Sequence, residues 1–299
     1  MILTAALILD ALVGEPAWLW SRIPHPAVVM GQMVAALERR LNDRSRRAGV
    51  LALCLLLLAS GGLGWVLSFL PGPLHIVIVA ILLAQRSLTT HVRAVAEGLD
   101  AGLDQGRHAV SMIVGRNTET LDEAAIARAA IESGAENLSD GVVAPAFWFL
   151  LAGLPGLLIY KAVNTADSMI GHRSARYEAF GWAAARLDDV MNLIPARLTG
   201  CLIAVASLNR AVWPVMWRDA RRHRSPNAGW PESAMAAALG LRLSGPRDYA
   251  EGPSNDPWLN PQGRDPDRRD IVAATRLMWR PWGLLTALLA VLSLTLWLA

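Results

Sequence analysis

The stretch PWGLLTALLAVLSLTLWLA, residues 281–299, constrains the fold more than any other part of the chain. Its nineteen residues include no charged side chain. A helix of about 20 apolar residues crosses the hydrocarbon core of a bilayer. This stretch therefore predicts a membrane-spanning helix, and the chain is expected to be an integral membrane protein.

Other apolar runs and the composition support this prediction. Only 18% of the residues are charged, compared with about 25% in typical soluble domains. We predict an all-α polytopic membrane protein with about 4–5 transmembrane or re-entrant helices and helical cytoplasmic segments. Residues 1–299 are expected to form a single integral membrane domain. The further apolar runs are residues 50–59, 74–84, 142–160 and 199–206.

The loops between apolar runs indicate an orientation. Residues 38–47, ERRLNDRSRR, contain five Arg, and basic residues are enriched in cytoplasmic loops. The uncharged LPGP at 70–73 predicts a short external turn. Residues 1–16 lack a basic region and a small-residue cleavage site, so we expect them to be retained in the protein.

Two segments read as lying outside the membrane. In residues 86–141 an apolar stripe at spacings of three and four predicts an amphipathic helix. Thr120 and Glu123 fit a capping box at the start of the next helix. That helix is expected to end near residue 136. Residues 218–280 contain eleven Arg and many Pro and Gly, which predicts a loop-rich polar segment. The stripe consists of Leu88, Val92, Val95, Leu99 and Leu103.

The run 142–160 has AGLPG in its middle, which leaves two halves too short to span a bilayer. A single span would place residues 161–198 on the external side. A broken or re-entrant helix would keep them on the cytoplasmic side, and such backbone is tolerated where protein buries it. We favour the broken form.

The segment YKAVNTADSMIGHR, residues 160–173, places many polar side chains next to this run. It contains Lys161, the only lysine of the chain. On a helix Asn164 and Ser168 share the face of Lys161, and Asp167 lies beside them. Polar side chains at membrane depth either form hydrogen bonds between helices or belong to a functional site. The presence of both a Lys and an Asp favours a functional site.

Two acidic patterns suit a divalent cation. Glu132, Glu136 and Asp140 recur every four residues, which predicts either a solvated helical face or a cation site. Asp188 and Asn192 are also four apart, with Asp189 alongside. Carboxylate and amide oxygens on one helical face suit Mg²⁺ bound to phosphate.

The remaining features exclude several classes. The chain has no P-loop, no dinucleotide-binding glycine motif and no HExxH or GxSxG motif. No basic stripe with interleaved aromatics indicates nucleic acid. Cys54 and Cys201 lie in apolar segments and predict buried thiols. In GEPAWLWSRIPHP, residues 14–26, Glu15 and His25 are the polar ends of a proline-rich turn.

Several of these segments together resemble the membrane cobalamin-biosynthesis proteins called CobD or CbiB. The similarity runs in order from about residue 9 to 250. It departs from the family pattern at Glu15, where the family has Asp, and at Asn117, where a carboxylate is lost. His172 stands where the family often has Tyr. The segments are LDALVGEPAWLWSRIPHP, GRNTETLDEAAIARAAIESGAENLSDGVVAP, YKAVNTADSMIGHRSARYEAFGWAAARLDDVMNLIPARL and SPNAGWPESAMAAALGLRLSGP.

The resemblance implies an adenosylcobinamide-phosphate synthase. Such an enzyme joins the propionate carboxylate of adenosylcobyric acid, a corrinoid, to (R)-1-amino-2-propanol phosphate, with ATP and Mg²⁺. A carboxylate and an amine need activation to condense, and an acyl phosphate or an adenylate would provide it. We expect a multi-pass protein of the cytoplasmic, or inner, cell membrane with its active site facing the cytoplasm. Expected partners besides the substrates are membrane lipid and other cobalamin-biosynthesis enzymes, with no nucleic acid.

The resemblance also suggests roles for the polar residues, which fall into three groups. The catalytic group is Lys161, Asn164, Asp167 and Ser168, of which Asp167 is also a candidate Mg²⁺ ligand. The substrate- and phosphate-binding group is Arg116, Thr118, Glu136, Asn137, Arg197, Ser225 and Asn227. The metal-binding group is Asp140, Asp188, Asp189 and Asn192.

Two alternatives remain open at this point. Broken helices with ionisable residues are also typical of transporters, here of a corrinoid or another anionic substrate. The few clean spans and the absence of a visible repeat disfavour that reading. A non-catalytic membrane anchor for other corrinoid enzymes is the third possibility.

Overall fold

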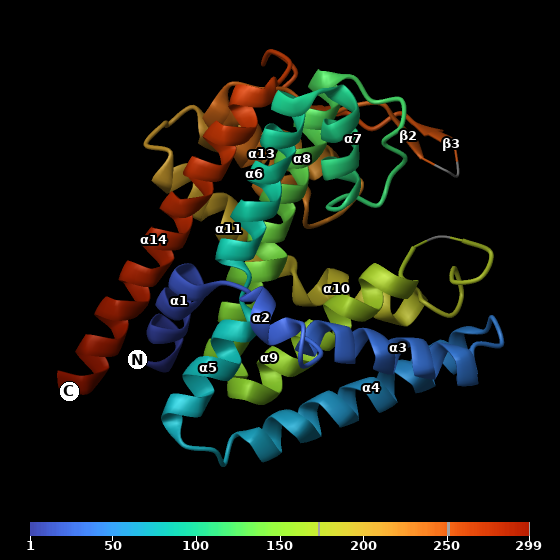
Figure 1. The fold of residues 1–299 in the computed structure, drawn as a ribbon, viewed down its shortest axis with the longest axis vertical. Helices are drawn as coiled ribbons and strands as arrows, with labels where there is room; N and C mark the ends of the chain where they lie inside the picture. The colour runs from blue at the N-terminus through green and yellow to red at the C-terminus, as the bar shows by residue number, and fades with distance from the viewer. Residues whose placement is uncertain (173, 250–251, 299) are drawn as a thin grey trace. The chain divides into compact units, whose positions relative to one another are not determined.

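The computed structural model describes residues 1–172, 174–249 and 252–298 and is largely helical (Figure 1). Contacts within the chain divide it into two compact units. Unit 1 comprises Met1–Ala84 and Ala144–Asn192, and unit 2 comprises Gln85–Val143 and Leu193–Ala299. The polar clusters of the sequence are thereby shared between two units, which are described in turn.

Unit 1 is built around α4 and α9. The N-terminus of α4 is capped by Ser45, whose hydroxyl accepts the Ala48 N–H at 3.2 Å. Leu56 of α4 and Ala166 of α9 belong to one buried apolar cluster with Phe180. The helices are α1 (Ile2–Val13), α2 (Ala17–Trp20), α3 (Pro26–Leu41), α4 (Arg46–Leu67), α5 (Gly72–Leu82), α9 (Ala144–Ile170) and α10 (Trp182–Met191).

The predicted break at AGLPG is confirmed in α9. Ala152 and Gly153 leave the helical conformation, and Gly153 has φ 61° and ψ −151°. Such a backbone is accessible essentially to glycine. Pro155 follows and lacks the N–H that a continuous helix would use. The break thus arises from local sequence, and it begins the segment that carries Lys161.

Unit 2 packs α6 and α8 against α14. Short antiparallel strand pairs join α13 to α14, β1 with β4 and β2 with β3. The helices are α6 (Gln85–Ala101), α7 (Leu103–Ser111), α8 (Glu123–Leu138), the π-helix η1 (Ser139–Val143), α11 (Leu193–Ala206), α12 (Val212–Asp219), the 3₁₀-helix η2 (Ala220–Arg222), α13 (Gly229–Leu239) and α14 (Arg268–Leu298). The strands are β1 (Leu243–Ser244), β2 (Arg247–Tyr249), β3 (Gly252–Ser254) and β4 (Trp258–Leu259).

Three predicted helix ends need correction. The cap of α8 is Asp122, whose carboxylate accepts the Ala125 N–H at 2.8 Å, so the capping box at Thr120 is wrong. The helix continues to Leu138 instead of residue 136. The last helix begins at Arg268 instead of residue 281, because its polar first turns pack an apolar stripe that includes the buried Ile271 and Met278.

The membrane prediction is confirmed at the level of the fold. Four helical stretches of the described residues have the length and apolar composition to cross a membrane: Arg46–Leu67, Gly72–Ala101, Glu123–Ile170 and Arg268–Leu296. A fifth results if Trp182–Met191 and Leu193–Ala206, bent by 44°, form one broken span. The extramembrane placement of residues 86–141 and 218–280 stays a prediction.

Candidate functional site

A chain of side-chain hydrogen bonds in unit 1 holds one buried carboxylate, that of Asp188. The Tyr160 hydroxyl donates to Asn192 Oδ1 at 3.0 Å. Asn192 Nδ2 donates in turn to Asp188 Oδ2 at 3.0 Å, and Asn164 Nδ2 donates to Asp188 Oδ1 at 3.4 Å. Asp188 is 9% exposed and Asn192 only 1%. Both carboxylate oxygens are therefore fixed in orientation.

A second carboxylate, that of Asp167, lies close enough to Asp188 for their charges to interact. Gly171 leaves room for it, because a Cβ there would collide with Asp167 Oδ1. Two neighbouring carboxylates repel each other unless a cation or a proton intervenes. The pair thus has the electrostatic character of a cation site.

The donor set of this cluster fits Mg²⁺, which prefers oxygen ligands and usually takes one or two carboxylates together with substrate phosphates and water. Asp167 and Asp188 supply carboxylate oxygens, and Asn164 and Asn192 orient Asp188. Throughout the described part of the chain, no group of three or more His, Cys, Asp or Glu lies close enough to enclose a metal. Phosphate oxygens of a substrate would therefore have to complete the coordination.

Other predicted residues of this cluster have different partners. Asp189 forms an ion pair of 3.1 Å with Arg186 on the same helix, so its environment differs from that of Asp188. Ser168 is exposed, and its hydroxyl donates to the Asn164 carbonyl at 2.9 Å. The Ser168 side chain thus bonds to the backbone of its own helix.

The proline-rich turn before α3 lies beside Lys161. His25 caps α3, where its Nδ1 accepts the Ala27 N–H at 3.2 Å. Burial lowers the pKa of His25, the Glu15 carboxylate opposes this shift, and the Lys161 ammonium adds to it. The imidazole of His25 is therefore favoured in its neutral form within reach of the Lys161 charge. The sequence indicated only a turn here.

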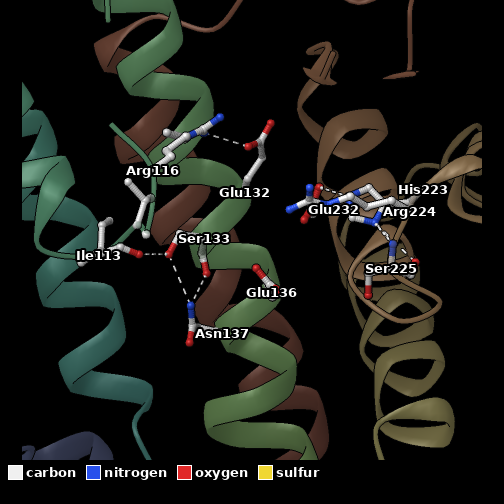
Figure 2. A pocket seen from close by; sticks show the side chains of 13 residues that line it. Ile113, Arg116, Glu132, Ser133, Glu136, Asn137, His223, Arg224, Ser225 and Glu232 are labelled. Atoms are coloured by element: carbon white, nitrogen blue, oxygen red, sulfur yellow. Dashed lines mark hydrogen bonds and ion pairs between the residues drawn. The ribbon is translucent and has the colours of Figure 1, made fainter. Parts of the chain in front are cut away.

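Unit 2 contains a separate cavity of about 320 Å³ between α8 and the turn that precedes α13 (Figure 2). On the α8 side, Arg116 Nη2 and Glu132 Oε2 form a buried ion pair of 3.1 Å. Glu132 Oε1 also accepts the backbone N–H of Ser244. Because both oxygens have partners, Glu132 fixes the Arg116 guanidinium at the cavity.

The opposite side of the cavity is a turn held by His223. Its Nδ1 accepts the Ser225 N–H at 3.1 Å, and its Nε2 lies 3.6 Å from Glu232 Oε2. Ser225 Oγ accepts the N–H groups of Asn227 and Ala228 at 3.2 and 3.1 Å. These contacts fix the backbone on both sides of Arg224, whose side chain lines the cavity.

The cavity brings together four residues predicted to bind substrate or phosphate: Arg116, Glu136, Asn137 and Ser225. Three others lie elsewhere in unit 2. Thr118 lines a different cavity, of about 560 Å³, and Arg197 stacks on the Trp230 ring at 4.8 Å. Asn227 is buried in the turn before α13.

Asp140 belongs to η1 in unit 2, whereas the other predicted metal ligands belong to unit 1. The ionisable lining residues that were missing from the predicted site are Glu132, His223, Arg224 and Glu232. Glu132 was detectable by its spacing from Glu136. The others lie in or next to a turn, where no periodicity marks the inward-facing side chains.

A comparison with protein families identifies the chain. The family model described as CobD/Cbib protein matches residues 3–278. The chain belongs to the CobD/CbiB family. The resemblance of its polar segments is thereby confirmed, and these segments contain the Asp188 cluster and most of the residues that line the cavity. No solved structure matches the chain.

Curated members of the family are similar to the chain along nearly their whole length. Cobalamin biosynthesis protein CobD of Brucella suis biovar 1 is 52% identical, over 98% of this chain and 97% of its own length. The protein of that name from Rhizobium meliloti is 48% identical, over 99% and 97%. The one from Rhodobacter capsulatus is 48% identical, over 99% and 98%. The alignments therefore cover 97–98% of the length of these relatives.

Proposed function

We propose that this protein is an ATP-dependent amide ligase of cobalamin biosynthesis, an adenosylcobinamide-phosphate synthase. It would join the propionate carboxylate of adenosylcobyric acid to the amino group of (R)-1-amino-2-propanol phosphate. Family membership and the names of the relatives support the pathway. The observation that carries the chemistry is the buried Asp188 carboxylate, oriented by Asn164 and Asn192 beside Asp167.

Amide formation from a carboxylate requires activation of one oxygen as a leaving group. In the proposed reaction a carboxylate oxygen attacks the γ-phosphorus of ATP, and ADP leaves. The amine then attacks the acyl carbon, loses a proton and displaces inorganic phosphate. Catalysis of phosphoryl transfer depends mostly on positioning and electrostatic stabilisation, so fixed charges are what the protein must provide.

The unit 1 cluster would provide these charges. Mg²⁺ bound there would neutralise phosphate charge during the transfer. Asp188 and Asp167 would hold the ion, while Tyr160 and Asn192 keep Asp188 in one orientation. The Lys161 ammonium, a compact cation on a flexible stem, would contact a phosphate oxygen. Neutral His25 beside it adds no competing positive charge at neutral pH.

The test is a reaction with purified protein in lipid nanodiscs. Adenosylcobyric acid, the amine phosphate and Mg·ATP are supplied, and mass spectrometry follows the amide product and the nucleotide product. We expect adenosylcobinamide phosphate with equal amounts of ADP and phosphate. AMP and pyrophosphate would instead indicate an adenylate.

Variants connect the reaction to the cluster. Asp188→Asn keeps the shape of the side chain and removes its charge, so we expect product formation to fall by at least about a hundredfold, as for loss of a ligand or its support. Asp104→Asn is the matched control, because Asp104 is 88% exposed and pairs only locally with Arg107. Normal turnover by Asp188→Asn, or corrinoid uptake into vesicles without product, would contradict the proposal and favour a transporter.

A further inference from the structure

Another cavity of unit 2, which we call the tryptophan cavity, lies between α11 and the segment that runs from α12 into α13. Its volume is about 340 Å³, and its lining includes Arg197, Trp217, Arg221, Ser225 and Trp230. None of the described residues that line it is acidic. The cavity is therefore basic and aromatic, and its charge is complementary to that of an anion.

Two guanidinium groups of this cavity lie over tryptophan rings. Arg197 Cζ lies 4.8 Å from the centroid of the Trp230 ring, and Arg221 Cζ lies 5.7 Å from that of Trp217. Arg197 Nη1 also donates to the Leu193 carbonyl at 2.6 Å. A guanidinium has five N–H donors. The rings therefore orient both cations and leave N–H groups that can donate to an anion.

The carboxylates near the cavity bind other cations. Arg218 Nε and Nη2 each donate to the buried Asp219 at 2.7 Å. Glu232 Oε2 lies 3.6 Å from His223 Nε2. Within the described part of the chain, neither of the two stacked guanidinium groups forms an ion pair with a carboxylate. Their positive charge is thus available to a ligand.

Ser225 adds a neutral donor to the cavity. Its Oγ accepts the N–H groups of Asn227 and Ala228 at 3.2 and 3.1 Å. A hydroxyl that accepts two hydrogen bonds still has its own proton to donate. An anion with several acceptor oxygens, such as a phosphate ester, can use this hydroxyl together with the guanidinium groups.

The face of α11 beside Arg197 is apolar and exposed. Ile194, Leu198 and Val205 are exposed, and their spacings of four and seven place them on one face of the helix. We call these three residues the apolar stripe of α11. This helix belongs to the broken candidate span, and exposed apolar patches mark membrane contacts. Trp217 is exposed as well, and Trp is typical of the boundary between hydrocarbon and water.

The geometry of the two rings disfavours a nucleotide in this cavity. Bases are commonly held by stacking on an aromatic face. Here each ring has a guanidinium over one face, and the Trp217 and Trp230 rings meet edge to face at 87°, with 4.8 Å between their centroids. A flat base therefore cannot enter between them. A nucleotide would also leave the apolar stripe uncovered, whereas acyl chains would cover it.

We infer that the tryptophan cavity binds the headgroup phosphate of an anionic phospholipid, with Arg197 and Arg221 on the phosphate oxygens and the acyl chains along the apolar stripe of α11. Basic pockets beside membrane helices bind anionic headgroups in other proteins. The inference does not depend on the ligase chemistry. It gives the protein a lipid site, and it assigns a lipid phosphate to Arg197, which the sequence predicted to bind phosphate.

The charge of the cavity selects among phospholipids. A choline or ethanolamine headgroup carries an ammonium group, which would lie near the guanidinium groups without an acidic lining residue to receive it. Such juxtaposed like charges disfavour the wrong ligand. A glycerol headgroup brings only hydroxyls. Phosphatidylglycerol is therefore the expected ligand, and phosphatidylcholine is the matched lipid that should bind poorly.

Native mass spectrometry of the delipidated full-length protein in a neutral detergent tests the inference, because it counts bound lipid molecules. The probes are phosphatidylglycerol and phosphatidylcholine with identical acyl chains. One basic residue near an anionic lipid changes its affinity by about fivefold. We expect Arg197→Gln and Arg221→Gln each to weaken phosphatidylglycerol by about that factor and to leave phosphatidylcholine nearly unchanged.

Three further variants separate charge, acyl-chain contact and general effects. Arg93→Gln is the control, because the Arg93 side chain is 66% exposed and pairs with Glu97 away from the cavity; it should bind both lipids like the wild type. Arg221→Lys keeps the charge and should retain most of the affinity for phosphatidylglycerol. Ile194→Ser should weaken both lipids to a similar extent, because their chains are the same. Melting temperatures establish that each variant is folded.

Several outcomes would overturn the inference. These are equal affinity of the wild type for the two lipids, unchanged affinity for phosphatidylglycerol in both Gln variants, and a loss in Arg221→Lys as large as in Arg221→Gln. Displacement of phosphatidylglycerol by ATP or by inorganic phosphate would also overturn it, because the cavity would then hold a soluble phosphate compound. No corrinoid or amine enters these measurements, so a protein that binds lipid in the expected pattern but forms no amide would contradict the proposed function alone.

Discussion

The hydroxyl of Tyr160, a residue with no exposed surface, donates a 3.0 Å hydrogen bond to Oδ1 of Asn192. The bond determines which way the amide of Asn192 points, since its nitrogen must then face Asp188. Without the phenol the amide could rotate and present oxygen to a carboxylate. Tyr160 therefore acts through Asn192 on the orientation of Asp188, as a positioning residue.

Tyr160→Phe should consequently alter the Mg²⁺ requirement more than the fold. Loss of a hydrogen-bond partner that orients a metal ligand typically weakens metal affinity by about tenfold to a hundredfold. We expect the Mg²⁺ concentration for half-maximal ligase activity to rise by about that factor. The measurement is a Mg²⁺ titration at saturating ATP and substrates.

Tyr177→Phe is the control for this change, because Tyr177 makes a ring contact with His172, at 4.9 Å between centroids, and is not part of the Asp188 chain. An equal shift in both variants would indicate a general loss of packing. If Tyr160→Phe lowers only the maximal rate and leaves the Mg²⁺ titration unchanged, its role is not the orientation of Asp188.

Close packing of α4 against α9 depends on Gly64. A Cβ at Gly64 would lie 2.5 Å from Cα of Pro155, whereas a Cβ at Gly62 would meet no atom within 4 Å. We expect Gly64→Ala to lower the free energy of unfolding by about 1–3 kcal/mol, as for other overpacked sites. Thermal unfolding of purified protein in detergent measures the effect.

Gly62→Ala tests whether the position or merely the residue type matters. It adds the same methyl group to the same helix, and its effect should be within about 1 kcal/mol of zero, given the small propensity difference between Gly and Ala. Similar melting temperatures for the two variants would contradict the close approach of α4 and α9 at Gly64.

The parts of the fold that sequence predicted correctly depend on local chemistry. The break in α9 follows from Gly153 and Pro155, which disrupt a helix in any context. The long apolar runs mark spans because bilayer thickness fixes their length. The start of α14 was missed because its first turns contain many polar residues, beginning with Arg268. The apolar residues between them, for example Ile271, are recognised as core only when their burial in the fold is known.

The candidate sites show the same division. Asp188 and Asn192 were predicted together because they are four residues apart, and this spacing places both on one face of a helix. Arg224 and His223 were missed because a turn has no period, and their direction is set by the contact of His223 with Glu232. Tyr160 seemed to belong to the apolar run, and only its bond to Asn192, 32 residues later, gives it a role.

The orientation of the protein in the membrane can be tested at the two ends of α4. This helix has 22 residues, so its ends should emerge on opposite sides of the bilayer. The five Arg of residues 38–47 predict that the end at Arg47 is cytoplasmic. In a variant without Cys54 and Cys201, we expect Phe69→Cys to react with an impermeant maleimide in intact cells.

Arg47→Cys should react with that reagent only in inverted membrane vesicles. Phe69 is 71% exposed, so a cysteine at this position is accessible without a change in packing. Labelling of Arg47→Cys in intact cells would place the basic loop outside. The expectation of a cytoplasmic active site would then be wrong, because ATP is supplied on the cytoplasmic side.

Asp265 links two arginines in unit 2 and should make its stability dependent on pH. Its carboxylate accepts hydrogen bonds from Arg242 Nε at 2.7 Å and Arg128 Nη2 at 2.6 Å. The Arg242 hydrogen bond, with the charges of both guanidinium groups, lowers the pKa of Asp265 to about 2, although partial burial opposes this. In an unfolded chain the pKa of an Asp side chain is about 3.9. The ionised form is therefore favoured in the folded state.

A lowered pKa contributes stability above the unfolded value and loses it as pH falls through the folded value. The melting temperature of Asp265→Asn should thus lie below that of the wild type at pH 5 and above, by roughly a few degrees. The difference should shrink between about pH 4 and pH 2. Because the Asp265 side chain is 41% exposed, solvent screening keeps the difference small. Asp104→Asn is the control, because the Asp104 side chain is 88% exposed, and its melting temperature should show no such trend. If the difference for Asp265→Asn stays constant from about pH 6 down to about pH 2, the effect of that substitution arises from packing and not from charge.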